Sequence, residues 1–340
     1  MAIANTPETA PGRSWTHPSG TQPWFQILCL LSAVSVGALV VLGGVVRVTG
    51  SGLGCPDWPL CHGGFLPPLE LQAVIEYSHR LVASALVGPL VLATCVSAWI
   101  AHRRDRWLVV PASAALILLI GQVLLGGVTV VQELPEGIVA AHLAIAQVLL
   151  ATLIILLVVS LNGPLTAPWE PNVALGPNKF PPMILAAAVM VFGMLLTGSY
   201  VTAAGATAVC GGWPLCHGDP FPDSGVQMIH MGHRYATLVF GLFMLYVLYL
   251  GIRPGQGIKE GSPMNKQDVN GNVIRWLAML GAAIFLAQIA TGAVTVISGY
   301  APEMRALHLS LATALWATMA GLAALAQARQ KSTRWEPANG

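Results

Sequence analysis

The segment Cys55-Pro-Asp-Trp-Pro-Leu-Cys-His-Gly63 returns 155 residues later as Cys210-Gly-Gly-Trp-Pro-Leu-Cys-His-Gly218. A His-Arg pair follows both copies, at His79-Arg80 and at His233-Arg234. Further matches occur at an offset of 166, where Gln122, Gly126, Thr129 and His142 correspond to Gln288, Gly292, Thr295 and His308. Spacings this regular indicate an internal duplication. We therefore predict two halves with the same order of elements.

The composition indicates a membrane protein. Of the 340 residues, 55% are hydrophobic and 9% are charged, which excludes an ordinary soluble domain. A membrane-spanning helix needs roughly 20 apolar residues. Such stretches occur at about 25–48, 73–101, 107–131, 138–161, 183–203, 226–251, 275–297 and 305–327. The predicted fold is an all-α integral membrane protein with eight transmembrane helices, four in each half.

The duplication also predicts the domain boundaries. Four-helix bundles are expected at 25–161 and 183–327, with short tails at 1–24 and 328–340. The segment 162–182 contains six prolines, which exclude a regular helix, so we interpret it as a linker between the bundles. Because each half has an even number of spans, both halves should insert into the membrane in the same orientation.

The basic residues predict which side each loop faces. Twelve of the 16 Lys and Arg residues lie in the two tails or in the loops after the second, fourth and sixth spans. The loops after the first, third, fifth and seventh spans contain none. The positive-inside rule then predicts that both termini are cytoplasmic. The membrane is expected to be the inner or plasma membrane of the cell. The repeated cysteine loops would face the outer, oxidising side, where disulfides persist.

Four histidines occupy matched positions near the outer ends of their helices: His79, His142, His233 and His308. A lone buried histidine is most often a satisfied polar residue, but four at repeated positions favour a role as ligands. Zinc usually needs three or four ligands close together. Haem supplies four equatorial nitrogens itself, so two histidines from separate helices suffice. The pattern therefore predicts one haem in each half.

The remaining basic residues are arginines at the outer ends of spans: Arg47, Arg80, Arg234 and Arg305. One interpretation is that they extend to the lipid headgroups. However, the positive-inside bias disfavours four arginines on this side unless they have anionic partners. Arg80 and Arg234 each follow a histidine directly, and this favours haem propionates as their partners.

One carboxylate distinguishes the two halves. Glu76 lies three residues before His79 and on the same helical face, whereas His230 stands at the corresponding position of the second half. Glu76 is either a first-turn carboxylate favoured by the helix dipole or an acid/base group that faces a substrate haem. We predict that the first half carries out the reaction and that the second half holds a resident haem.

These features together resemble the haem A synthase family, over roughly residues 25–327. The resemblance rests on eight spans in two repeats, the Glu76-x-x-His79-Arg80 helix, the paired histidines and the Cys-x5-Cys loops. It implies stepwise oxidation of the C8 methyl group of haem O to a formyl group, which gives haem A for terminal oxidases. Glu76 matches the family's essential carboxylate. The implied ligands are His79 and His142, with Arg80, for haem O, and His233 and His308, with Arg234, for a haem b cofactor.

The resemblance has further implications. The bacterial members with paired cysteines suggest disulfides Cys55–Cys61 and Cys210–Cys216, which act either as structural clips or in activity and haem handling. A haem O synthase, the farnesyltransferase, is the expected source of substrate. The electron partner is an unidentified protein or quinone, because the chain has no dinucleotide-binding glycine motif. Membrane lipid surrounds the spans, and no nucleic acid partner is expected.

Other functions remain open at this point. A membrane cytochrome with two bis-histidine haems is the main alternative, although both sites would lie at the same depth. A transporter is permitted by the repeat, but the polar residues gather at the outer leaflet rather than at the midplane. A membrane thiol oxidoreductase would use the cysteine loops and leave the histidines unexplained. His230 could also compete with His233 as an iron ligand, but the shared His-Arg pair favours His233.

Overall fold

The computed structural model describes residues 21–165, 180–253 and 266–332. All regular elements within these ranges are helices, which confirms the all-α prediction. They are α1 (Pro23–Val48), α2 (Leu71–Val82), η1 (Ala83–Val87), α3 (Gly88–Ala101), α4 (Arg106–Val131), α5 (Glu136–Asn162), α6 (Phe180–Ala203), α7 (Gly225–Ile252), α8 (Lys266–Ile297) and α9 (Pro302–Ser332).

Eight helical stretches are long and apolar enough to cross a membrane, and the ends of each lie within three residues of the prediction. The π-helical turn η1 joins α2 and α3 into one of these spans, Leu71–Ala101. Large apolar side chains remain exposed along every span. In a bilayer these side chains would face lipid, while the helices satisfy their own backbone hydrogen bonds. The chain is a multi-pass membrane protein.

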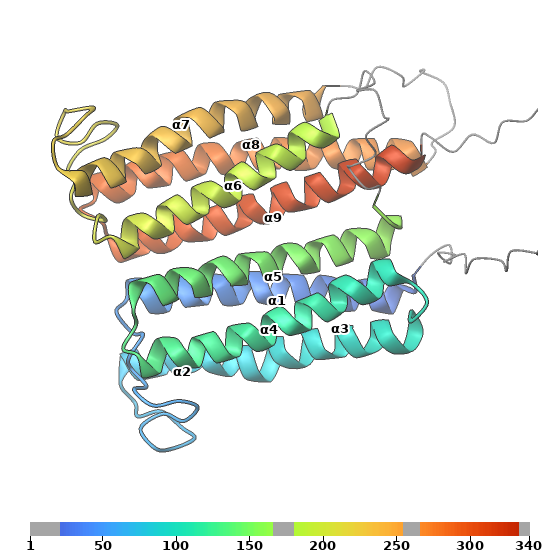
Figure 1. Cartoon of the computed structure of the whole chain (residues 1–340), viewed down its shortest axis with the longest axis horizontal. Helices are drawn as coiled ribbons and strands as arrows, with labels where there is room; N and C mark the ends of the chain where they lie inside the picture. The colour runs from blue at the N-terminus through green and yellow to red at the C-terminus, as the bar shows by residue number, and fades with distance from the viewer. Residues whose placement is uncertain (1–20, 166–179, 254–265, 333–340) are drawn as a thin grey trace, which may run out of the picture.

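The helices run side by side in two groups, α1–α5 and α6–α9 (Figure 1). The loops that follow α1 and α6 contain the repeated cysteine segments, and both project from the same end of the molecule (Figure 1). We call this end the Cys-loop end. The two groups meet mainly where α5 and α1 pack against α9.

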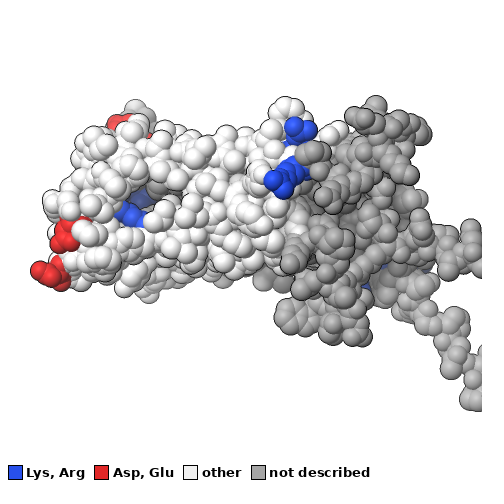
Figure 2. Space-filling view, turned by 90° about the horizontal axis from the view of Figure 1, so that it is seen from above, with Lys and Arg blue, Asp and Glu red and all other residues white. Residues whose placement is uncertain are grey.

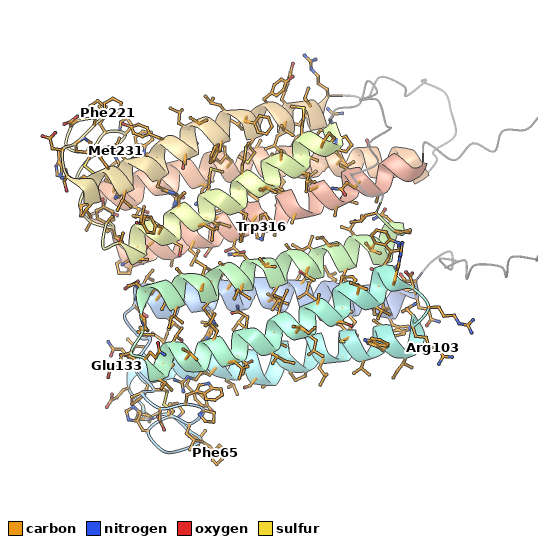
Figure 3. All side chains as sticks on the ribbon, in the orientation of Figure 1. Phe65, Arg103, Glu133, Phe221, Met231 and Trp316 are labelled. Carbon is orange, nitrogen blue, oxygen red and sulfur yellow. A yellow bond between two sulfur atoms is a disulfide. The ribbon has the colours of Figure 1, made fainter. Side chains whose placement is uncertain are left out.

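A buried polar contact joins α5 to α9. Trp316 lies between the two helix groups (Figure 3) and donates its indole N–H to the Gln147 carbonyl oxygen at 2.8 Å. The Gln147 side chain in turn donates to the Thr313 hydroxyl at 3.0 Å. Gln147 and Thr313 are only 1% and 3% exposed. Buried polar groups of this kind need partners, so the contact fixes the register between α5 and α9.

The predicted tails and linker lie largely outside the described residues, which exclude 1–20, 166–179, 254–265 and 333–340. The domain boundaries therefore remain predictions. At one edge the linker is shorter than expected, because α6 already begins at Phe180. Pro181 and Pro182 lie in its first turn, where a missing N–H removes no helical hydrogen bond.

Candidate functional site

The four predicted histidines lie at equivalent depths in the two halves. His79 and His233 are each eight residues beyond the first residue of α2 and α7, and His142 and His308 are each six residues beyond the first residue of α5 and α9. At about 1.5 Å per residue, the imidazoles lie roughly 9–12 Å into their helices. Within each half the two rings are close enough to interact electrostatically. The structure thus brings the members of each predicted pair together.

Each imidazole packs against a glycine of a neighbouring helix. A Cβ atom built at these glycines would lie between 3.0 and 3.4 Å from a ring atom, which is tighter than ordinary van der Waals contact. The contacts pair Gly43 with His79, Gly126 with His142, Gly198 with His233 and Gly292 with His308. The sequence comparison had matched Gly126 with Gly292 but had missed Gly43 and Gly198. Their offset of 155 was the signal that could have found them.

The histidines of α5 and α9 have buried ring nitrogens without partners. The Nδ1 atoms of both His142 and His308 bond to no group in the described part of the chain. The two matched glutamines of the preceding helices approach these residues differently. Gln122 donates to the backbone carbonyl oxygen of His142 at 3.1 Å, whereas the Gln288 amide nitrogen lies 3.2 Å from Nε2 of His308.

These residues fit a haem better than a bare metal ion. Among the residues that the structure describes, no three His, Cys, Asp or Glu side chains gather closely enough to hold a metal ion together. A haem iron needs only one protein nitrogen on each side of the porphyrin. Each half provides two histidines from separate helices, and His142 and His308 have buried ring nitrogens that lack a partner. Buried ring nitrogens of this kind need partners, and a bound group placed between the two histidines could supply them.

Glu76 lies buried where α2 meets the Cys55–Cys61 loop. The residue is only 4% exposed. One carboxylate oxygen accepts from Nη2 of Arg80 at 2.5 Å, and the other accepts from the backbone N–H of Cys55 at 2.8 Å. A buried carboxylate is tolerated when it is paired and hydrogen-bonded in this way. Glu76 therefore connects the helix that carries His79 to the disulfide loop.

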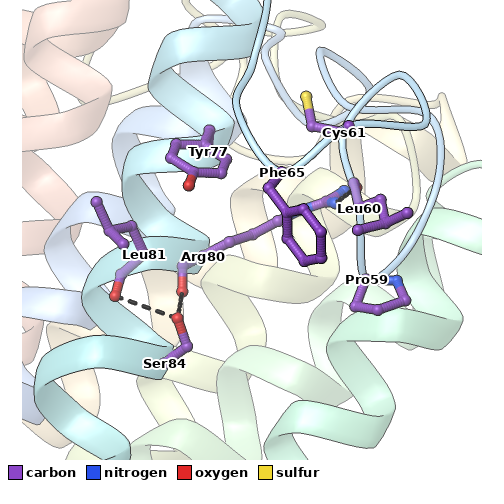
Figure 4. A pocket seen from close by; sticks show the side chains of 9 residues that line it. Pro59, Leu60, Cys61, Phe65, Tyr77, Arg80, Leu81 and Ser84 are labelled. Carbon is purple, nitrogen blue, oxygen red and sulfur yellow. Dashed lines mark hydrogen bonds between the residues drawn. The ribbon is translucent and has the colours of Figure 1, made fainter.

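Arg80 completes the connection between α2 and this loop. Its guanidinium donates to the carbonyl oxygens of Cys55, Asp57 and Leu60, each at 2.7 Å. Figure 4 shows the Arg80 side chain extending from α2 past Phe65 toward Leu60 of the loop. The pocket drawn there has a volume of about 150 Å³. These bonds account for Nη1 and Nη2 of Arg80, and its role as a propionate partner stays a prediction.

In the second half, His230 takes the place of Glu76. The Nδ1 atom of His230 lies 2.9 Å from the Ala206 carbonyl oxygen, so this nitrogen carries the proton. Its other nitrogen, Nε2, then accepts from Arg234 at 3.3 Å. Both ring nitrogens are therefore engaged in the structure. This arrangement favours His233 over His230 as the iron ligand.

Arg234 fastens the second cysteine loop to α7. It donates to the carbonyl oxygens of Gly212 and Pro214 at 3.0 and 2.9 Å. The hydroxyl of Tyr300, in the connection between α8 and α9, donates to the Cys210 carbonyl oxygen at 2.5 Å. Burial raises the pKa of the Tyr300 hydroxyl, although Arg234 opposes this shift. The hydroxyl therefore stays protonated and able to donate at neutral pH.

The two cysteine loops share one conformation. Disulfides join Cys55 to Cys61 and Cys210 to Cys216, with Cα–Cα distances of 4.6 and 4.7 Å. Each loop also has a cis peptide bond between its Trp and Pro residues. The histidines that follow, His62 and His217, have φ values of 52° and 54° and turn their rings toward backbone atoms of their own loops.

Asp57 gives the first loop a carboxylate at a position where the second loop has glycine. Its two oxygens accept from the backbone N–H groups of His62 and Gly63 at 2.6 and 2.7 Å. These hydrogen bonds, the one from Gly63 above all, lower the pKa of the Asp57 carboxyl. Gly212 stands at the corresponding position, 155 residues later.

Trp58 reaches from the first loop to α4. A Cβ atom at Gly127 would lie 3.0 Å from the Trp58 indole, so the indole rests against the bare backbone of the helix. The next residue toward the N-terminus, Gly126, is the one that contacts His142. The loop therefore covers the helix surface directly beside a predicted ligand.

The other two outer arginines differ from each other. Arg47 pairs with both carboxylate oxygens of Glu136, at the start of α5. The Arg305 side chain forms no hydrogen bond or ion pair with any residue that the structure describes, while its backbone N–H donates to the Ala301 carbonyl oxygen. Figure 2 shows a hollow in one face of the molecule, near the end with acidic residues, and basic side-chain atoms lie inside it. Arg234 and Arg305 are the basic residues at the Cys-loop end of the α6–α9 group.

Comparisons with known proteins agree on one family. Residues 26–320 match the COX15-CtaA model, described as cytochrome oxidase assembly protein. A heme A synthase of an Exiguobacterium species is 32% identical over 315 residues, covering 90% of this chain and 96% of the relative. Heme A synthases of Exiguobacterium sibiricum and Alkalihalophilus pseudofirmus are 31% and 29% identical. They cover 87% and 84% of this chain, and 93% and 92% of their own lengths.

Proposed function

The chain belongs to the COX15-CtaA family of cytochrome oxidase assembly proteins, and we propose that it is a haem A synthase, the activity for which its relatives are named. The substrate is haem O, whose C8 methyl group is oxidised through an alcohol to a gem-diol that loses water to give the formyl group of haem A. The observation that carries this proposal is the duplication of one histidine pair, with a carboxylate beside it in the first half alone.

The first half receives haem O. His79 and His142 would hold the substrate iron, and the glycines that contact them let the helices approach closely. Glu76 lies one helical turn outward from His79 and is paired with Arg80 and hydrogen-bonded to the Cys55 N–H. We assign it the electrostatic or proton-transfer role during methyl oxidation, because a buried charge preorganised beside the reacting group acts strongly in a low-dielectric site.

The second half holds the resident cofactor, which we assign as haem b. His233 and His308 would hold it, because the ring nitrogens of His230 already bond to the Ala206 carbonyl and Arg234. Arg234 and Arg305 lie at the outer end where propionates would lie, and the Arg305 guanidinium has no partner among the described residues. When bound, haem b would relay electrons. The electrons removed from the methyl group would pass to a partner protein or a quinone.

The disulfide loops keep the outer ends of both sites in place. Arg80 and Arg234 each donate to carbonyl oxygens of their own loop, and Trp58 packs on the helix surface next to His142's glycine. We propose that these loops face the outside of the inner or plasma membrane and that both termini are cytoplasmic. This orientation follows the distribution of basic residues and an oxidising environment for the disulfides.

The decisive experiment is co-expression with a haem O-forming farnesyltransferase, followed by chromatography of the extracted haems. Haem A or its hydroxylated precursor is the expected product. Haem b alone would instead indicate an electron-transfer cytochrome, and the absence of any pigment would indicate a transporter. The Glu76→Gln variant is the matched control, because it should retain haem b and form no haem A.

A further inference from the structure

The ring of His233 has a hydrogen-bond partner that its counterpart in the first half lacks. Nδ1 of His233 lies 2.8 Å from Oγ1 of Thr197, which is on α6. The Thr197 hydroxyl also lies 2.8 Å from the Met194 carbonyl oxygen, three residues earlier on the same helix. A hydroxyl has one proton to donate, and a carbonyl oxygen can only accept. The proton is therefore directed to Met194, and Thr197 accepts a hydrogen bond from His233.

This direction fixes the tautomer of His233. Because Nδ1 is the donor, it carries the proton, and Nε2 keeps the lone pair that an iron requires. A hydrogen bond from the distal N–H of a ligating histidine fixes the orientation of the ring and raises its basicity as a ligand. Gly198, the residue next to Thr197, packs against the same ring, because a Cβ atom built at this glycine would lie 3.2 Å from a ring atom of His233. Two adjacent residues of α6 thus hold the His233 ring, one by packing and one by a hydrogen bond.

The first half preserves the packing contact but not the hydrogen bond. Gly43 stands 155 residues before Gly198 and contacts the ring of His79. At the same offset, Leu42 stands in place of Thr197. The alignment is supported by the following turn, where Gly50 and Gly205 share a φ of 67°. A leucine side chain cannot accept a hydrogen bond, and no group within 21–165, 180–253 or 266–332 bonds the ring of His79.

We propose that Thr197 is a positioning residue for His233 that makes the second haem site a retaining site, and that Leu42 leaves the first site exchangeable. This inference rests on the proposed function, in which the second half retains its haem while the first must release each product. The difference between a threonine hydroxyl and an apolar leucine side chain at one matched position would then separate a cofactor site from a substrate site in a duplicated scaffold.

The test uses the full-length protein, purified with haem bound. In the Thr197→Val variant the hydroxyl is replaced by a methyl group of similar size. The midpoint potential of the second-half haem should rise, because a less basic ligand stabilises the ferric state less. Haem transfer to apomyoglobin should become about 10–100-fold faster, the usual effect of losing such a partner. Thr197→Ser should restore both values to those of the parent protein.

A second threonine offers a matched control. The hydroxyl of Thr237 donates to the backbone carbonyl oxygen of His233 at 2.9 Å and does not contact its ring. Thr237→Val should therefore leave the potential and the rate of haem transfer unchanged. The converse variant, Leu42→Thr, should slow haem loss from the first half when it is measured in a His233→Ala background.

The outcomes separate this inference from the proposed function. If His233→Ala leaves the haem spectrum unchanged, His233 is not a ligand, and both the cofactor assignment and this inference fail. If His233→Ala alters the spectrum but Thr197→Val behaves like Thr237→Val, only the role of Thr197 is overturned. Should Thr197→Val fail to accumulate, an unchanged rate of haem loss in Leu42→Thr would still overturn the inference.

Discussion

Glu76 and His230 occupy the same place in the two halves of the chain, and each binds the arginine four residues later on its own helix. Glu76 accepts from Arg80 at 2.5 Å, and His230 accepts from Arg234 at 3.3 Å. Each also bonds the backbone of the connection that precedes its helix. Glu76 accepts from the Cys55 N–H, and His230 donates to the Ala206 carbonyl oxygen. The exchange of a carboxylate for an imidazole therefore keeps the scaffold and changes the charge beside the site.

Replacing Glu76 by Gln should abolish haem A formation and leave the second-half haem in place. The amide can still accept from the Cys55 N–H, but the negative charge is lost. General acid–base or electrostatic roles of this kind contribute roughly 10²-fold or more, so product formation should fall by at least that factor. Chromatography of extracted haems measures the product, and the optical spectrum measures haem b.

Two further variants distinguish chemistry from loop support. Asp57→Asn weakens the same loop without touching Glu76, and Ser78→Ala changes a hydroxyl that bonds only within α2. Both should retain most of the activity. Equal loss in Asp57→Asn and Glu76→Gln would show that Glu76 acts by holding the loop.

His233→Met and His308→Met should each shift or abolish the low-spin haem spectrum of the purified protein. The physical reason is that a thioether is a weaker and softer axial ligand than imidazole. His230→Gln should leave the low-spin spectrum unchanged, because its ring nitrogens bond to Ala206 and Arg234. A spectrum altered by His230→Gln and unaffected by His233→Met would reverse the assignment.

Gly198→Ala and Gly193→Ala should differ in their effect on haem occupancy, although both glycines lie on α6. A Cβ atom at Gly198 would lie 3.2 Å from the His233 ring, whereas one at Gly193 meets nothing within 4 Å. Overpacking costs about 1–3 kcal/mol, while Gly to Ala in an open helical position gains up to about 1 kcal/mol. We expect Gly198→Ala to lower haem occupancy and Gly193→Ala to preserve it. Haem content per protein checks this, and equal occupancy in the two variants would contradict the packing role of Gly198.

The first cysteine loop should loosen in acid before the second. The backbone N–H groups of Gly63 and His62 lower the pKa of Asp57 below its usual 3.8. A carboxyl with a lowered folded-state pKa stabilises the fold at pH values above its unfolded-state pKa. That contribution is lost as pH falls below about 3.8 and through the folded-state pKa. The second loop has Gly212 at the matched position and therefore has no counterpart of the two hydrogen bonds that Asp57 accepts.

Hydrogen exchange of the His62 and Gly63 amides measures the acid response. Protection should fall below about pH 4 in the parent protein and should already be low, and independent of pH, in Asp57→Asn. The His217 amide, which bonds the Gly211 carbonyl oxygen instead, serves as the internal control. An identical acid response at His62 and His217 would rule out Asp57 as the cause.

Much of the fold was predictable because membrane insertion depends on simple quantities. The eight spans follow from hydropathy and length, and all lie within three residues of the predicted positions. The equivalent depths of His79, His142, His233 and His308 also followed from the repeat, because helical rise converts residue spacing into distance. The α6 boundary was missed because proline disfavours a helix interior but not its first turn, where Pro181 lies.

The remaining features of the site depend on side-chain contacts between helices that are distant in the sequence. Glycine at 43 or 198 looks like any other small residue until the neighbouring imidazole is seen to rest on it. The sequence predicts an anion as the partner of Arg80, whereas the structure shows backbone carbonyl oxygens of the Cys55–Cys61 loop. The conformation of this loop does not follow from the spacing of apolar residues. Gln147 contacts Thr313 and Trp316, which lie 166 and 169 positions away in the sequence. No local sequence pattern indicates these contacts.

The Gln147–Thr313 bond lies five residues inward from His142 on one helix and from His308 on the other. Because α5 and α9 are locked in register at that point, a sliding or tilting of one helix as haem O arrives or haem A departs has to be shared by its neighbour. A movement of α5 during turnover in the first half would then also displace α9, which carries His308 of the second half. The Gln147–Thr313 bond would in this way make the two helix groups respond together.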